Sequence, residues 1–161
     1  PWTFGIFTPF RSGLSALQSG LLAQNHWKLA LALLSFLIGI WFVIPNGRDA
    51  WPITSFHMIG VLLIVILRSN IQKYIHSPNL DKVALGISIA AYCGNITRHL
   101  FGNTILLFLL DLSPLIFISA IPLTFIEQLA FTLISAILGG TIIKTSIHDV
   151  LQLDQSRANN L

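Results

Sequence analysis

Charged residues are scarce in this 161-residue sequence, where aspartate, glutamate, lysine and arginine together make up only 9%. A soluble domain is about a quarter charged, so this chain lacks the polar groups needed to cover a water-facing surface. Hydrophobic residues account for 54% of the sequence, and its mean hydropathy is +0.78. The composition therefore predicts an integral membrane protein that has membrane lipid as a partner.

Cysteine pairs, basic clusters and metal-binding motifs are also missing. A single cysteine, Cys93, excludes an internal disulfide, and we expect it to be a small packing residue. The net charge of +3 is spread along the chain, which argues against a nucleic-acid partner. The five histidines show neither HxxxH nor HExxH spacing, and there is no CxxC motif or glycine-rich phosphate loop. We therefore expect no catalytic residue, metal site or cofactor.

The apolar stretches predict an all-α, polytopic transmembrane bundle that forms a single domain over residues 1–161. A crossing needs about 20 apolar residues. Four spans are predicted at residues 28–45, 52–69, 83–109 and 122–144, with breaks at 45–47, 77–81 and 111–114. A further apolar segment at 12–24 is too short to cross comfortably. The polar tail at 145–161 is expected to fray.

The N-terminal region suggests contacts beyond this chain. The sequence begins at Pro1 instead of methionine, which predicts a processed start or an upstream segment as large as a helix. Residues 1–10 are aromatic with two prolines, which suits an approach along the membrane interface. Ser12, Ala16 and Gly20 then follow at four-residue spacing, which permits close helix approach. Packing within the chain is the favoured interpretation, and docking of another membrane subunit is the alternative.

The distribution of basic residues predicts the orientation. If the loops alternate, one side collects a set of basic residues: Lys28, Arg68, Lys73, Lys82, Lys144 and Arg157. The other side has Arg48 and, if it lies in a loop, Arg11. Cytoplasmic loops carry the excess of basic residues in membrane proteins. We therefore expect a multi-pass protein of the cell membrane with a cytoplasmic C-terminus.

Polar residues interrupt the third predicted span. Asn95, Arg98 and His99 lie in its middle, and Asn103 follows one turn later. An ionisable side chain at the bilayer centre costs roughly 2.5–3.5 kcal/mol, so it rarely lies there without a role. The last span contains one acid, Glu127, with Gln128 beside it. The sequence predicts an Arg98–Glu127 ion pair, or a network that joins these six residues.

Two interpretations of this polar set remain open. In the first, the ion pair only fixes the register of two helices, although a buried ion pair is weak evidence for stability. In the second, these groups line an outward-facing pocket that binds a small molecule, with Trp51 near its mouth. Ionisable groups inside the membrane are more often functional, which favours the pocket. The candidate ligand-binding residues are therefore Asn95, Arg98, His99, Asn103, Glu127, Gln128 and Trp51.

The layout of the last two spans resembles a known transporter family. Its elements are ITRHLFGN, a break at Pro114, the run Pro122-Leu-Thr-Phe-Ile-Glu127 and a span ending in Gly139-Gly140. Over residues 83–143 this layout is similar to substrate-binding S components of energy-coupling-factor vitamin transporters and their archaeal relatives. The resemblance implies a ligand on the extracellular side, near Asn103, Glu127 and Trp51. It also implies docking to a membrane partner through Ser12, Ala16 and Gly20.

The resulting functional prediction is a membrane-embedded, non-enzymatic subunit that binds the substrate of a small-molecule or vitamin transporter. S components have six helices and this sequence predicts four clear spans, so a second class stays open. That alternative is a non-catalytic structural subunit of a larger membrane enzyme complex. A metal-dependent membrane enzyme that uses His99 and Glu127 is a distant third, because two ligands do not complete a metal site.

Overall fold

The computed structural model describes the backbone of residues 2–158 and the side chains of residues 8–142. The described backbone is helical between short turns and contains no strand. The elements, in chain order, are α1 (Trp2–Ala23), α2 (Trp27–Val43), α3 (Pro45–Asp49), the 3₁₀ helix η1 (Trp51–Thr54), α4 (Ser55–Leu67), α5 (Asn70–Ile75), α6 (Leu80–Leu110), α7 (Pro114–Ser119) and α8 (Ile121–Ala158). The all-α prediction is therefore confirmed.

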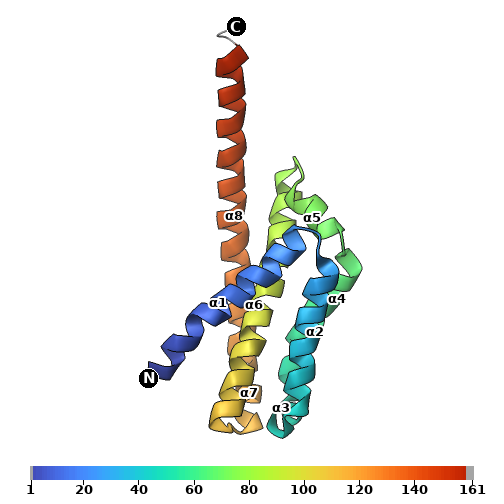
Figure 1. Cartoon of the computed structure of the whole chain (residues 1–161), viewed down its shortest axis with the longest axis vertical. Helices are drawn as coiled ribbons and strands as arrows, with labels where there is room; N and C mark the ends of the chain where they lie inside the picture. Colours follow the sequence, from blue (N-terminus) through green and yellow to red (C-terminus); the bar gives the residue numbers. More distant parts are fainter. Residues whose placement is uncertain (1, 159–161) are drawn as a thin grey trace.

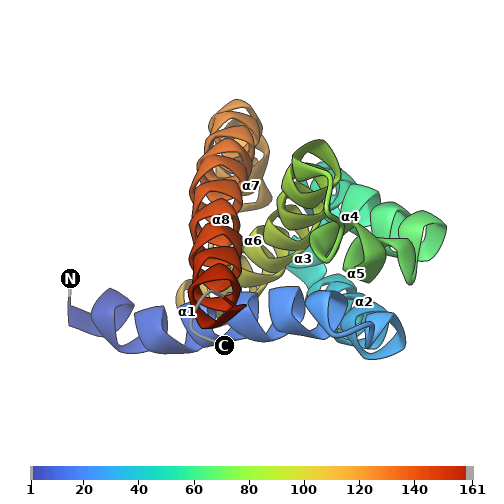
Figure 2. The same cartoon turned by 90° about the horizontal axis from the view of Figure 1, so that it is seen from above.

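Helix α6 is the centre of the bundle and packs against α1, α2, α4, α5 and α8. In Figure 1, α2 and α4 lie on one side of α6, and α1 crosses it diagonally. The same figure shows α8 extending well beyond the other helices toward the C-terminus. The view from above in Figure 2 separates α8 from the α2–α4 pair, with α6 between them.

The chain is interrupted close to each predicted break, although residues 45–47 themselves form part of α3 and α6 already begins at Leu80. Each interruption has a local cause. Pro45 is the first residue of α3, and Pro114 is the first residue of α7. Both prolines occupy a position where the missing N–H costs no helical hydrogen bond. Asp111 ends α6 in the left-handed conformation, with φ 47° and ψ 46°. At the other end of α6, the Asn79 side chain accepts hydrogen bonds from the backbone N–H groups of Asp81 and Lys82.

Two boundaries differ from the prediction. The proposed interfacial stretch 1–10 and the short segment 12–24 form one helix, α1, with Pro9 inside it. Proline removes one backbone hydrogen bond, and the packing of α1 on α6 stabilises the helix despite this loss. The helix also does not end near residue 144, since α8 continues to Ala158. No glycine or proline follows Gly140 to end this helix. Residues 159–161 lie outside the described part.

Helix length supports fewer membrane spans than the sequence predicts. Within the described residues, Ile121–Ile142 of α8 is the one segment both long and apolar enough to cross a membrane, and only 11% of its window is buried. Trp27–Val43 and Trp51–Leu67 are apolar but shorter. The polar groups in the middle of α6 lower its hydropathy. The structure thus shows one candidate span instead of four.

The apolar core lies where α2, α4 and α6 meet. Trp41 is fully buried, and its ring packs edge-on against Phe117 of α7 at a centroid distance of 5.3 Å. Cys93 is fully buried, as predicted for a packing residue. Gly60 of α4 lies against Ile96 of α6, so the two helices approach closely there. This core holds α6 in place, with its polar groups available to α1 and α8.

A hydrogen bond joins α3 to the turn between α6 and α7, at the lower end of the bundle in Figure 1. The Asn46 side-chain amide donates to Oδ1 of Asp111 at 2.8 Å. Replacing Asn46 with alanine should lower the free energy of unfolding by about 0.5–1 kcal/mol, because the bond is exposed. Asn46→Asp should cost more, since it places two carboxylates together. Thermal unfolding in detergent measures both, and equal stabilities of Asn46→Ala and wild type would contradict the prediction.

Candidate functional site

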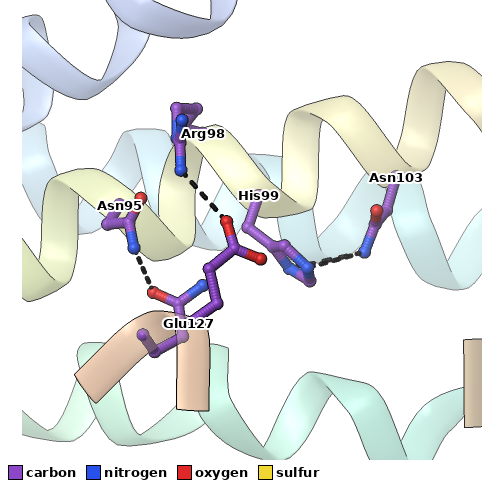
Figure 3. Close-up of polar contacts among 6 residues, drawn as sticks. Asn95, Arg98, His99, Asn103 and Glu127 are labelled. Carbon is purple, nitrogen blue, oxygen red and sulfur yellow. Dashed lines mark hydrogen bonds and ion pairs between the residues drawn. The ribbon is translucent and has the colours of Figure 1, made fainter. Parts of the chain in front are cut away.

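Two contacts between polar side chains join α6 to α8 in the described part of the chain. Nη2 of Arg98 lies 3.4 Å from Oε1 of Glu127, and Nδ2 of Asn95 donates to Oε1 of Gln128 at 2.6 Å. Figure 3 shows the Arg98 guanidinium directed at the Glu127 carboxylate. The Arg98 and Glu127 side chains are 25% and 38% exposed, so the pair is accessible from outside the bundle. The predicted ion pair is therefore confirmed.

Helix geometry explains why these four groups meet. Asn95 and Arg98 are three residues apart and therefore lie on one face of α6. Gln128 follows Glu127 directly, and the antiparallel path of α8 presents them to that face in reverse order. Gly139 of α8 packs against Ile87 of α6 further along the same interface, where a Cβ would lie 3.0 Å from the Ile87 side chain. This close approach fixes the register of the two helices.

His99 and Asn103 form a separate contact. The Asn103 amide nitrogen lies 3.3 Å from Nδ1 of His99, one turn away on α6. The His99 ring stacks on His57 of α4, with centroids 5.9 Å apart and an angle of 20° between the planes. His57 is fully buried. The six predicted polar residues thus fall into two groups, of which only one joins α8.

A pocket of about 340 Å³ adjoins the Arg98–Glu127 pair. Its walls come from α1, α6 and α8, and we call it the α1/α6/α8 pocket. The lining residues are Ser12, Ser15, Ala16, Ser19, Ala91, Asn95, Arg98, Phe131 and Ser135. The guanidinium carbon of Arg98 lies 5.1 Å from the Phe131 ring centroid, within the range of a cation–π contact. Hydroxyl, amide and guanidinium groups therefore share one cavity.

Helix α1 forms one wall of this pocket because α6 offers it small residues. A Cβ on Gly94 would overlap the Ser19 hydroxyl and the backbone carbonyl of Ser15. The Ser19 hydroxyl also donates to the Ala90 carbonyl at 2.9 Å. Two turns further along α6, a Cβ on Gly102 would lie 2.6 Å from Nε of Arg11. Gly94 and Gly102 thus provide the space for α1 and for the Arg11 side chain.

The remaining predicted site residues have different positions. Ser12 and Ala16 line the pocket and are themselves exposed, so this part of the small-residue stripe borders an open pocket. A Cβ on Gly20 would meet no atom within 4 Å. Trp51 is 62% exposed on η1 and does not line the pocket, so the structure does not bring it to the polar group. Binding of a partner to this stripe stays a prediction.

Sequence reasoning missed Arg11, His57 and three serines that line the pocket, Ser15, Ser19 and Ser135. The sequence predicts Arg11 only as a possible loop residue, beside an interfacial stretch at residues 1–10. Its position four residues before Ser15 was the available signal, since that spacing places both on one face of a continuous helix. The stacking of His57 on His99 has no sequence signal, because the two belong to different helices.

The described residues offer no metal centre, since no three histidine, cysteine, aspartate or glutamate side chains gather there. His99 contacts Asn103 and His57, whereas Glu127 contacts Arg98. The structure therefore gives the two proposed metal ligands different partners. It adds nothing in favour of a metal-dependent enzyme.

Comparison with known proteins gives one informative similarity. The chain is 29% identical over 133 residues to MJ0923, an uncharacterized protein of Methanocaldococcus jannaschii. The match covers 83% of this chain and 45% of the archaeal protein, so the chain spans about half the length of that relative. No protein-family model and no solved structure matches the chain. The relative is compatible with an archaeal origin, and the resemblance to S components gains no support.

Proposed function

We propose that this chain is a multi-pass membrane protein whose α1/α6/α8 pocket binds a small molecule, as the substrate-binding subunit of a membrane transporter. The observation that carries the proposal is the pocket itself, which places Arg98, Asn95 and serine hydroxyls in a cavity among apolar helices. Its volume of about 340 Å³ falls within the range of small-molecule sites. Arg98 and Asn95 would bind the ligand, with Glu127 and Gln128 holding them in position.

The exposure of α8 supports a membrane environment. Its apolar face presents Ile126, Leu133 and Ile137 with 63%, 62% and 67% of their surfaces exposed. An exposed apolar surface of this length requires lipid or a protein partner. In the proposed topology α2, the η1–α4 unit, α6 and α8 cross the cell membrane. Lys28 and Arg68 both contact Trp27, at the end of the bundle that the positive-inside rule makes cytoplasmic.

Filling the pocket should weaken ligand binding. In Ser135→Phe the added ring occupies the cavity, and we expect at least a roughly tenfold loss of bound small molecule, as overpacking costs about 1–3 kcal/mol. Ser35→Phe is the matched control, because Ser35 is exposed on α2. Native mass spectrometry of the protein in nanodiscs measures the bound molecule. Equal occupancy in Ser135→Phe and wild type would contradict a site in this pocket.

A second function is favoured by the same exposed face of α8. A non-catalytic subunit of a larger membrane complex would bury this surface against neighbouring chains. The mass measurement separates the two proposals, because it reports companion chains as well as small molecules. Purification with companion chains and without a small molecule would favour the accessory subunit and contradict the binding subunit.

A further inference from the structure

The charged groups where α1, α6 and α8 meet do not balance. Among the described side chains, Arg11 and Arg98 contribute two positive charges there, and Glu127 contributes one negative charge. The Arg11 guanidinium lies against Gly102, one turn from Arg98 on α6, and interacts electrostatically with Arg98 and Glu127. The contact between Arg98 and Glu127 is a single one at 3.4 Å, whereas charge-assisted hydrogen bonds are usually about 2.7–2.9 Å. One carboxylate therefore compensates two guanidinium groups incompletely.

The same region is short of hydrogen-bond acceptors. Nε of Arg11, Nε of Arg98 and Nε2 of Gln128 are buried, and none has a partner among the described residues. All three are N–H donors. The hydroxyl of Thr132, one turn beyond Gln128 on α8, is also buried without a partner. A buried donor without an acceptor is unfavourable. Of these residues Arg98 lines the pocket, so a ligand bound there can bring an acceptor to its guanidinium.

We propose that the α1/α6/α8 pocket takes the carboxylate or phosphate group of its ligand at the side where Arg98 lines it. The second guanidinium is that of Arg11, which lies against Gly102, one turn from Arg98 on α6. This inference rests on the proposed ligand-binding function and names the class of ligand. An anion supplies both the missing negative charge and the missing acceptors. Arginine suits this task because its planar fork binds carboxylate and phosphate oxygens in pairs. The hydroxyls of Ser12, Ser15 and Ser135 line the same pocket and can donate to the remaining oxygens.

The anion has two potential sources, a soluble molecule and the headgroup of an anionic lipid. Both sources would place a phosphate or carboxylate group in the pocket. Binding of such a group is tested by thermal unfolding of the wild-type chain and Arg11→Gln in nanodiscs of phosphatidylcholine. The first arm adds inorganic phosphate and uses sodium chloride of equal ionic strength as the reference. The second arm replaces part of the phosphatidylcholine with phosphatidic acid. Arg11→Lys is a further variant, because it keeps the charge and loses the paired geometry.

Binding of phosphate should raise the melting temperature of the wild type by about 5 °C or more at a hundredfold excess over Kd. Arg11→Gln should lose most of this shift, and Arg11→Lys should retain part of it. A shift with phosphate supports a soluble anion, and a shift confined to phosphatidic acid supports a lipid headgroup. If Arg11→Gln does not fold, the shifts of the wild type and Arg11→Lys are compared instead, and the shift of Arg11→Lys should be the smaller.

Equal shifts in the wild type and both Arg11 variants would overturn the proposal, because phosphate would then stabilise the protein without this site. Failure of the anion proposal can be distinguished from failure of the proposed ligand-binding function. A neutral or cationic molecule that co-purifies with wild type and is lost in Ser135→Phe would refute the anion and leave the binding subunit standing. Absence of any co-purifying molecule, together with absence of both shifts, would refute both proposals.

Discussion

Gly94→Leu should separate α1 from α6 and lower the free energy of unfolding by about 3 kcal/mol, or prevent folding. The reason is steric, since a Cβ at this position would overlap both the Ser19 hydroxyl and the Ser15 backbone carbonyl. A hydroxyl can rotate away, but a carbonyl in the middle of α1 moves only if the helix moves. Overpacking of a tight contact typically costs about 1–3 kcal/mol, and more where backbone must shift.

Gly20→Leu is the matched control for this prediction. Gly20 also lies in a helix of the same interface, but a Cβ there would meet no atom within 4 Å. Leucine is the better helix former by up to about 1 kcal/mol, so this variant should be as stable as wild type or slightly more stable. Thermal unfolding measures the stability, and hydrogen exchange of α1 measures its detachment. Equal effects of the two substitutions would show that α1 does not depend on close contact at Gly94.

Local chemistry made the helix breaks predictable. Pro45 and Pro114 act through their own backbone geometry, so their positions could be read without knowing the fold. The Arg98–Glu127 pair was predictable for a different reason. Few charges interrupt the apolar segments, so the choice of partners was small. Both predictions depended only on residues that are uncommon in apolar helices, namely prolines and charged side chains.

The third wall of the pocket could not be predicted in the same way. This wall exists because Gly94 and Gly102 leave space for α1 to pack closely on α6. A glycine in a helical sequence does not indicate which other helix packs against it. Arg11 acquires its role only through that contact. The length of α8 was also misjudged, since the polarity of its last turns was taken as a helix end. Polarity describes the environment of a helix and does not by itself end it.

Glu127→Leu should be more damaging than Arg98→Met, although the two side chains are partners. Removing Glu127 leaves Arg11 and Arg98 together without a carboxylate, whereas removing Arg98 leaves Glu127 near Arg11. Removing one partner of a fully buried ion pair lowers the free energy of unfolding by about 3–5 kcal/mol, whereas removing one partner of a surface pair lowers it by about 0–1 kcal/mol. With side chains 25% and 38% exposed, this pair lies between the two limits. We expect about 1–2 kcal/mol for Arg98→Met and about 2–3 kcal/mol for Glu127→Leu.

The double variant decides whether the two charges act together. Removing both leaves no stranded charge on this contact, so Arg98→Met with Glu127→Leu should cost less than the sum of the single changes by about 1 kcal/mol or more. Adding Arg11→Gln to Glu127→Leu should also restore part of the stability, since it relieves the repulsion between the two arginines. Thermal unfolding in nanodiscs measures all of these variants. Strict additivity would assign Arg98 and Glu127 to separate partners, and the register of α6 and α8 would then depend on Gly139 and the Asn95–Gln128 hydrogen bond.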